Sequence, residues 1–156
     1  MFIGNRALRN LSRRVVVELA VAVLLAGFPI DFPRDTSAGN AWSFVLRHLS
    51  ILLHAVIGTL ALTEAVVFAA RAISTPRPRM LVVACLGAVS TLAAFVAGIG
   101  YVSAGQGDLA LALMTLGWVT AMVTYIAGWV LGRRGMRAER QTVANSAHSD
   151  PANEPS

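Results

Sequence analysis

The chain has 156 residues, of which 56% are hydrophobic and 13% are charged, and its mean hydropathy is positive. This composition excludes an ordinary soluble domain and predicts a polytopic membrane protein. The net charge is +5, and all thirteen cationic residues are arginines. These arginines lie at the ends of apolar segments instead of forming a basic face with interleaved aromatic residues, so we expect no nucleic-acid partner.

The first part of the chain is a basic segment, residues 1–14, followed by an apolar segment, residues 15–30. We expect the basic segment to lie at the cytoplasmic membrane surface and the apolar segment to be the first span. A polar loop rich in turn formers follows it. The loop ends at Trp42, a residue type that is common at the membrane interface.

The second apolar segment, residues 44–72, is the longest. As a single helix it would be about 43 Å long, which exceeds the roughly 30 Å thickness of the hydrocarbon layer. We therefore expect one continuous helix that tilts or protrudes from the bilayer.

The remaining apolar segments are residues 80–102 and 109–131, each preceded by a short turn. A basic stretch begins at residue 133, and after Arg140 the chain is polar and without periodicity, which predicts a disordered tail to residue 156. The predicted fold is therefore all-α: an antiparallel bundle of four transmembrane helices, between a basic N-terminal segment and a cytoplasmic C-terminal tail.

The arginines also predict the orientation of the chain in the membrane. Eleven of them fall in the N-terminal segment, around the turn at residues 74–79 and after the last span, whereas the opposite side has only Arg34 and Arg47. The positive-inside rule then places both termini in the cytoplasm. For a bacterial protein, we expect a multi-pass protein of the cytoplasmic (inner) membrane.

The second span carries most of the polar groups that the apolar region has to accommodate. On a helical projection Arg47, Ser50, His54 and Glu64 share one side, together with Gly58. Ionisable groups at such depths are costly and usually face a bundle interior or a partner. These residues, with Glu18 of the first span, form a candidate polar intramembrane site.

Two interpretations of the carboxylates remain open. Glu18 and Glu64 fall at similar depth on antiparallel spans, so they could share a proton or hold a cation. Alternatively, each carboxylate could reach toward an arginine of its own helix, Glu18 toward Arg14 and Glu64 toward Arg71.

Histidines allow a comparison with four-helix membrane cytochromes, which hold haem between histidines on different helices. Here His48 and His54 lie on one helix about 120° apart, so they cannot both ligate one iron. A monomer would need His54 with Met114 or Met122, and the other possibility is that two copies of the chain pair their own His54 residues. A hydrogen-bonded structural histidine is the alternative, and we expect no cofactor.

Trp42, Arg47, His48, Ser50 and His54 could instead line a shallow outer pocket for a quinone head group or an anionic lipid. Arg47 could equally be an anchor that extends to the interface. The single Cys85 lies in an apolar run, so no thiolate metal site is expected.

Small residues recur at helical spacing in the third and fourth spans. They lie on one narrow stripe of each helix, and small residues promote close packing of membrane helices. An antiparallel pairing centred on the turn would place the following residues opposite one another: Gly98 and Gly117, Ala94 and Ala121, Thr91 and Thr124, Gly87 and Gly128.

The sequence contains none of the common catalytic or nucleotide-binding motifs, and we expect no enzymatic activity. The segments RHLSILLHAVIGTLALTEAVVFAARAI and MTLGWVTAMVTYIAGWVLG resemble small four-span bacterial integral membrane proteins of unknown function. This resemblance implies the fold and no activity.

We therefore expect a non-enzymatic accessory or assembly protein that contacts the lipid bilayer and binds another membrane protein or a second copy of itself. The alternative is a small proton- or cation-linked transporter, or a redox subunit that binds haem or quinone.

Overall fold

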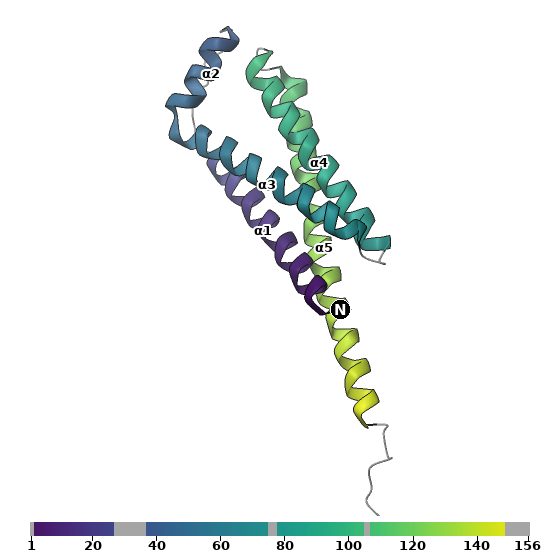
Figure 1. Cartoon of the computed structure of the whole chain (residues 1–156). Helices are drawn as coiled ribbons and strands as arrows, with labels where there is room; N and C mark the ends of the chain where they lie inside the picture. Colours follow the sequence, from purple (N-terminus) through teal and green to yellow (C-terminus); the bar gives the residue numbers. More distant parts are fainter. Residues whose placement is uncertain (1, 27–36, 75–77, 105–106, 149–156) are drawn as a thin grey trace, which may run out of the picture.

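A computed structural model describes residues 2–26, 37–74, 78–104 and 107–148 (Figure 1). These residues form five α-helices, which confirms the all-α prediction. The helices are α1 (Phe2–Ala26), α2 (Ala38–Arg47), α3 (Leu49–Ile73), α4 (Pro78–Ser103) and α5 (Asp108–His148).

Three of the described helices are long and apolar enough to cross a membrane: α3, α4 and the Asp108–Arg134 part of α5. Each of these segments is 25 to 27 residues long, which corresponds to about 38 to 40 Å of helix. The α1 helix is also 25 residues long, but arginines in its first half lower its hydropathy. The structure thus shows a helical chain with three candidate spans.

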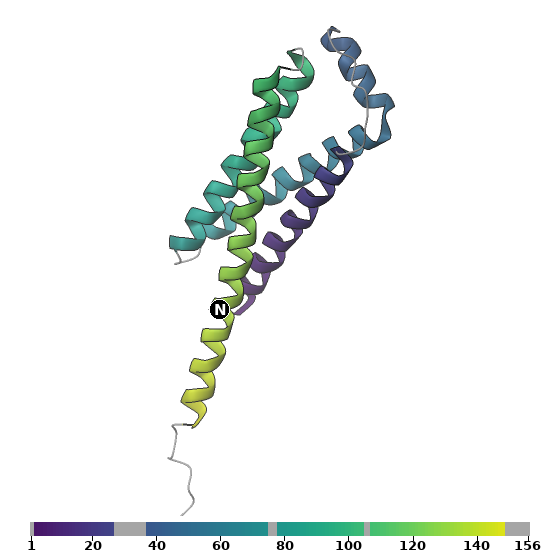
Figure 2. The same ribbon diagram turned by 180° about the vertical axis from the view of Figure 1, so that it is seen from behind.

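The long helices run antiparallel to their neighbours in sequence (Figures 1 and 2). The α1 and α3 helices pack together, as do α4 and α5, and the two pairs meet through contacts of α1 with α5 and of α3 with α4. We call the end where α1 begins and α4 begins the basal end, and α5 continues beyond it. The distal end holds α2 and the turn between α4 and α5.

Three expected boundaries were wrong. The segment 44–72 is not one helix, because the backbone of His48 is extended (φ −104°, ψ 105°) and separates α2 from α3. The basic segment and the first apolar segment form a single helix, α1, that ends at Ala26, and residues 27–30 lie outside the described part. Residues 141–148, which were expected to belong to the disordered tail, continue α5.

The break at His48 has a local cause. Its imidazole Nδ1 lies 2.8 Å from the carbonyl oxygen of Phe44, and its ring stacks on the Phe44 ring with centroids 3.7 Å apart. Such side-chain interactions with the preceding turn compete with continuation of the helix. Because the chain turns at His48, α2 projects away from the axis of α3 toward the end of α4 (Figure 1).

Four helices meet at Gly128 of α5 in the basal half. A Cβ placed on this glycine would lie 3.0 Å from Val83 of α4, 3.3 Å from the hydroxyl of Ser12 of α1 and 3.8 Å from Phe68 of α3. One turn earlier, Tyr125 packs edge-on against Phe68, with ring centroids 5.8 Å apart. Tyr125, Phe68, Ser12 and Val15 are completely buried there.

The predicted register of α4 against α5 was wrong by about one helical turn. A Cβ on Gly117 would meet Ala94, at 3.1 Å from its Cβ, instead of Gly98. Gly98 faces the sulfur of Met114, and Gly87 faces the ring of Tyr125. Gly87 and Gly98 of α4 therefore receive large side chains of α5, whereas the predicted register placed small residues opposite them.

Candidate functional site

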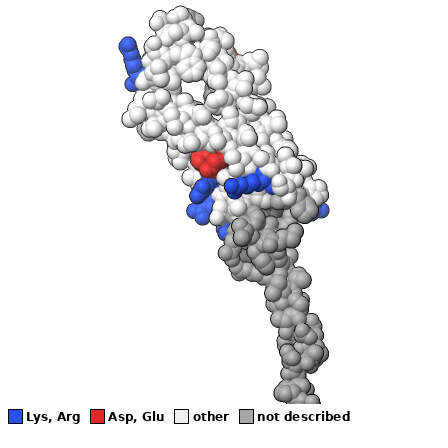
Figure 3. Space-filling model, in the orientation of Figure 1, with Lys and Arg blue, Asp and Glu red and all other residues white. Residues whose placement is uncertain are grey.

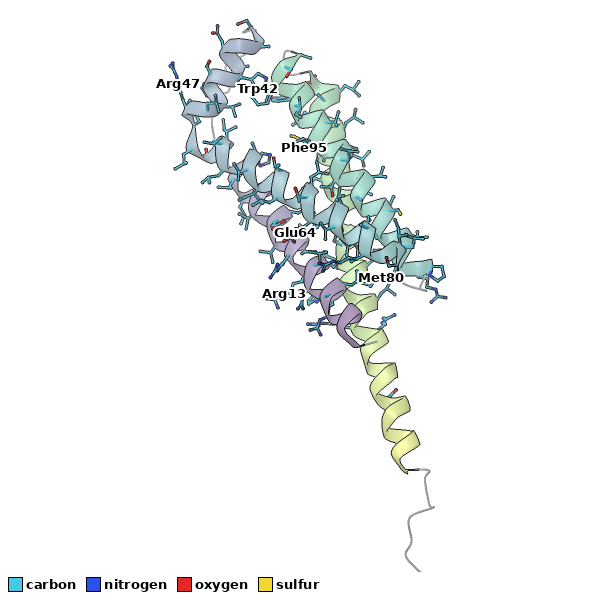
Figure 4. The ribbon with its side chains drawn as sticks, in the orientation of Figure 1. Arg13, Trp42, Arg47, Glu64, Met80 and Phe95 are labelled. Carbon is cyan, nitrogen blue, oxygen red and sulfur yellow. The ribbon has the colours of Figure 1, made fainter. Side chains whose placement is uncertain are left out.

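The carboxylates of Glu18 and Glu64 lie close together between α1 and α3. Glu64 Oε1 of α3 is 3.9 Å from a guanidinium nitrogen of Arg14 of α1, and the Glu18 carboxylate is within electrostatic range of both groups. Figure 3 shows one acidic patch with arginine side chains beside it, and Figure 4 places Glu64 over the contact of the two helices. The sequence-based alternative that paired Glu64 with Arg71 was therefore wrong.

This cluster is only partly neutralised. The Arg14 side chain is 72% exposed, whereas that of Glu64 is 23% exposed. The second carboxylate oxygens of Glu18 and Glu64 are both buried, and neither has a hydrogen-bond partner among the described residues. Two carboxylates held close together, with one exposed arginine between two helices, form a group that could accept a proton or a cation.

One ring nitrogen of His54 makes a hydrogen bond to another helix. Its Nδ1 lies 2.7 Å from the carbonyl oxygen of Ala22 on α1. Since a carbonyl can only accept, Nδ1 carries the proton in this hydrogen bond. This is the histidine hydrogen-bonded within the bundle that was the alternative to a haem ligand.

The partners considered for a haem site contact other helices. The Met114 sulfur lies 3.5 Å from where a Cβ on Gly98 of α4 would be, and Met122 packs against the buried core. His54, in contrast, is turned toward α1. The described residues contain no group of three histidine, cysteine or acidic side chains that could hold a metal ion.

The residues of the expected outer pocket do not converge. The Trp42 indole donates a hydrogen bond of 3.2 Å to the hydroxyl of Ser103, which ties α2 to the end of α4. Arg47 is exposed and points away from the bundle, on the side of α2 opposite to Trp42 (Figure 4). His48 and His54 each use Nδ1 to bind a backbone carbonyl, that of Phe44 on α2 and that of Ala22 on α1.

Three hydrogen bonds hold α1 inside the bundle. Trp118 of α5 donates to the carbonyl of Leu19, His54 of α3 donates to that of Ala22, and Ser12 donates to the carbonyl of Tyr125. Trp118 and Tyr125 lie in the middle of the apolar part of α5. The segment of α1 from Ser12 to Ala22 is therefore level with the middle of a candidate span.

These carbonyl acceptors were not predicted, and no sequence pattern indicates them. Every residue has a carbonyl group, and only the packing decides which carbonyl a side chain from another helix reaches. The Arg14–Glu64 pair was missed for the same reason, since its members are fifty positions apart in the chain.

The distal half of the bundle is open between α3 and α4. The buried residues of α3 are Ala61, Ala65, Phe68 and Ala72, and those of α4 are Met80, Ala84, Gly87, Ser90 and Thr91. All of these residues lie in the basal halves of the two helices or at their midpoints. Figure 3 shows a hollow in the surface between the distal halves of α3 and α4. The α2 helix lies at the distal side of this hollow (Figure 1).

Gly58 of α3 lies beside this opening. On a helical projection it falls on the same side of α3 as the buried residues, within about 60° of Ala61. Nevertheless, no described atom outside the adjoining turns of α3 lies within 4 Å of the position that a Cβ would take. Phe95 of α4 lies on the side of that helix that faces α3 (Figure 4). An inward-facing helix surface is thus left uncovered by the residues that the structure describes.

No protein-family model, curated protein or solved structure matches this chain, so the arrangement of its own residues carries the functional argument.

Proposed function

We propose that this protein is a non-enzymatic accessory or assembly protein that binds a transmembrane helix of another membrane protein in the distal opening between α3 and α4. The observation that carries this proposal is the uncovered inward face at Gly58. In a membrane, van der Waals packing against small residues drives helix association. An inward-facing glycine with no described side chain against it offers such a surface.

The same proposal includes four spans, with both termini in the cytoplasm of a bacterium. The hydrogen bonds of α1 support the fourth span, because they hold its apolar half level with the middle of α5. The arginines near the basal end support the orientation, since cytoplasmic ends of membrane proteins are enriched in arginine and lysine.

Site-specific photocrosslinking tests the proposal in cells. A photoreactive phenylalanine analogue at position 58 should yield a discrete adduct with one protein. The matched control is the same analogue at Leu60, an exposed residue about 160° away on α3, which should crosslink to lipid or to nothing discrete. Equal adducts at both positions, or none at position 58, would contradict a docked helix.

A second function, proton- or cation-linked transport, is favoured by one observation: the two buried carboxylate oxygens of Glu18 and Glu64 that have no hydrogen-bond partner among the described residues. Purified protein in liposomes should then mediate a proton or cation flux that Glu64→Gln abolishes. Flux that is unaffected by Glu64→Gln, or is absent with the unmodified chain, would leave the accessory function as the one supported.

A further inference from the structure

The distal halves of α3 and α4 diverge, and α2 lies between their ends (Figures 1 and 2). Both helices have their buried residues in the basal halves or at the midpoints. The α2 helix contacts α3 and α4 and, among the described helices, neither α1 nor α5. It therefore completes a frame around the distal opening, with α3 and α4 as the two sides.

The two sides of this frame rest on different helices. In the distal half of α3, the Nδ1 of His54 donates a hydrogen bond of 2.7 Å to the carbonyl of Ala22 on α1. In the distal half of α4, Gly98 packs against the sulfur of Met114 on α5. The distal half of α3 is thus held on α1 and that of α4 on α5, so the separation of the two depends on what connects their ends.

The connection to α4 is made by one side of α2. Ala41 and Val45 lie one turn apart on this side and are buried. Trp42 lies beside them, and its indole N–H donates a hydrogen bond of 3.2 Å to the hydroxyl of Ser103 at the end of α4. Arg47, about 140° from Trp42 around the helix, points away from the bundle (Figure 4). A buried apolar pair and a directed hydrogen bond therefore hold α2 in place.

We propose that α2 is a brace that keeps the distal opening at a fixed width, and that Trp42 and Ser103 are its positioning residues. This inference rests on the proposed function, in which the same opening receives a transmembrane helix of another protein. A surface that already has its binding geometry loses less conformational freedom on association. Loss of the hydrogen bond from Trp42 to Ser103 lets the separation of α3 and α4 vary and weakens binding of the partner.

Double electron–electron resonance of the purified full-length chain tests the brace in the absence of a partner. Spin labels are attached at Leu53→Cys of α3 and Val96→Cys of α4, two exposed positions in the distal halves, in a Cys85→Ser background. The parent chain should give one narrow distance distribution. Trp42→Phe removes the hydrogen-bond donor and should lower the ratio of the narrow to the broad population about fivefold, the effect of one neutral hydrogen bond.

Variants of Ser103 separate this hydrogen bond from a general loss of packing. Ser103→Ala removes the acceptor and should broaden the distribution as Trp42→Phe does, whereas Ser103→Thr keeps the hydroxyl and should leave it narrow. The double variant Trp42→Phe/Ser103→Ala should be no broader than either single variant, because both act through one interaction. A distal distribution that stays narrow in both single variants would overturn the brace.

A second label pair is the control for the rest of the bundle. Val67→Cys of α3 and Val82→Cys of α4 are exposed positions in the basal halves, where the two helices have their buried residues. Their distance should be the same in every variant. Equal broadening at the basal and the distal pair would show that the variants loosen the whole bundle, and would also overturn the brace.

Photocrosslinking at position 58 distinguishes failure of the brace from failure of the proposed function. With the photoreactive analogue there, Trp42→Phe should reduce the yield of the discrete adduct, and Ser103→Thr should retain it. A broadened distal distribution in Trp42→Phe, with no adduct even for the unmodified chain, would refute the docked helix and support the brace. An adduct whose yield Trp42→Phe leaves unchanged would support the docked helix and overturn the role of the brace in binding.

Discussion

The ring of Tyr125 lies directly on the backbone of Gly87. A Cβ on Gly87 would be only 2.7 Å from Cζ of the Tyr125 ring, closer than such atoms approach in real proteins. Tyr125 also accepts the Ser12 hydrogen bond through its carbonyl and packs edge-on against Phe68. This single residue therefore joins α5 to the other three long helices, and its ring requires a glycine at position 87.

Gly87→Ala should therefore destabilise the bundle, although alanine is the better helix former by about 1 kcal/mol. The ring of Tyr125 must move to admit the methyl group, and overpacking of this kind costs about 1–3 kcal/mol. Gly100→Ala on the same helix is the control, because nothing lies within 4 Å of its Cβ position. Unfolding in detergent should show a lower free energy of unfolding for Gly87→Ala and no decrease for Gly100→Ala. Equal stabilities of the two variants would contradict the packing of Tyr125 on Gly87.

Disulfide formation should report the register of α4 against α5. In a Cys85→Ser background, Ala94→Cys with Gly117→Cys should crosslink readily, because a Cβ on Gly117 would lie 3.1 Å from the Cβ of Ala94. Ala94→Cys with Ala121→Cys, the pair that the symmetric register would favour, should crosslink poorly, since disulfides need Cβ atoms about 3.8 Å apart. The extent of crosslinking of each cysteine pair is measured by oxidation, proteolysis between the two helices and gel mobility. More efficient crosslinking of the second pair than of the first would support the symmetric register.

Removing the arginine that contacts Glu64 should destabilise the protein less than reversing the charge of Glu64. Arg14→Gln removes a contact of 3.9 Å to a largely exposed guanidinium and should cost less than about 1 kcal/mol. Glu64→Lys places a cation against Arg14 in the contact between α1 and α3, and should be strongly destabilising. Leu62→Ile, which keeps an apolar side chain on α3, is the mild reference. Denaturant titration that ranked Glu64→Lys with Leu62→Ile would refute this placement of Glu64.

Reporter fusions distinguish four spans from three. A reporter after Arg140 should be cytoplasmic, and one inserted between Thr36 and Asn40 should be external. An N-terminal reporter is the decisive measurement, because it is cytoplasmic only if α1 crosses the membrane. An external N-terminus combined with a cytoplasmic C-terminus would leave α3, α4 and α5 as the only spans.

The sequence by itself determined the helical class and the three apolar helices α3, α4 and the first part of α5. Runs of apolar residues of this length can form only helices in a membrane, and prolines and turn formers separate them. It did not determine where α2 ends, because the break at His48 depends on how its ring packs on Phe44. It also did not determine that α5 continues as a helix to His148, since that polar stretch has no periodicity.

Only the tertiary structure decided the register of α4 and α5 and the partner of Glu64. Shifting one helix along another by one turn leaves the same side of each helix at the contact, so a stripe of small residues is compatible with both registers. The choice depends on which large side chain fills which gap, and Tyr125 fills the gap at Gly87. Likewise, Arg71 is near Glu64 along the chain, but the packing of α1 on α3 places Arg14 beside it.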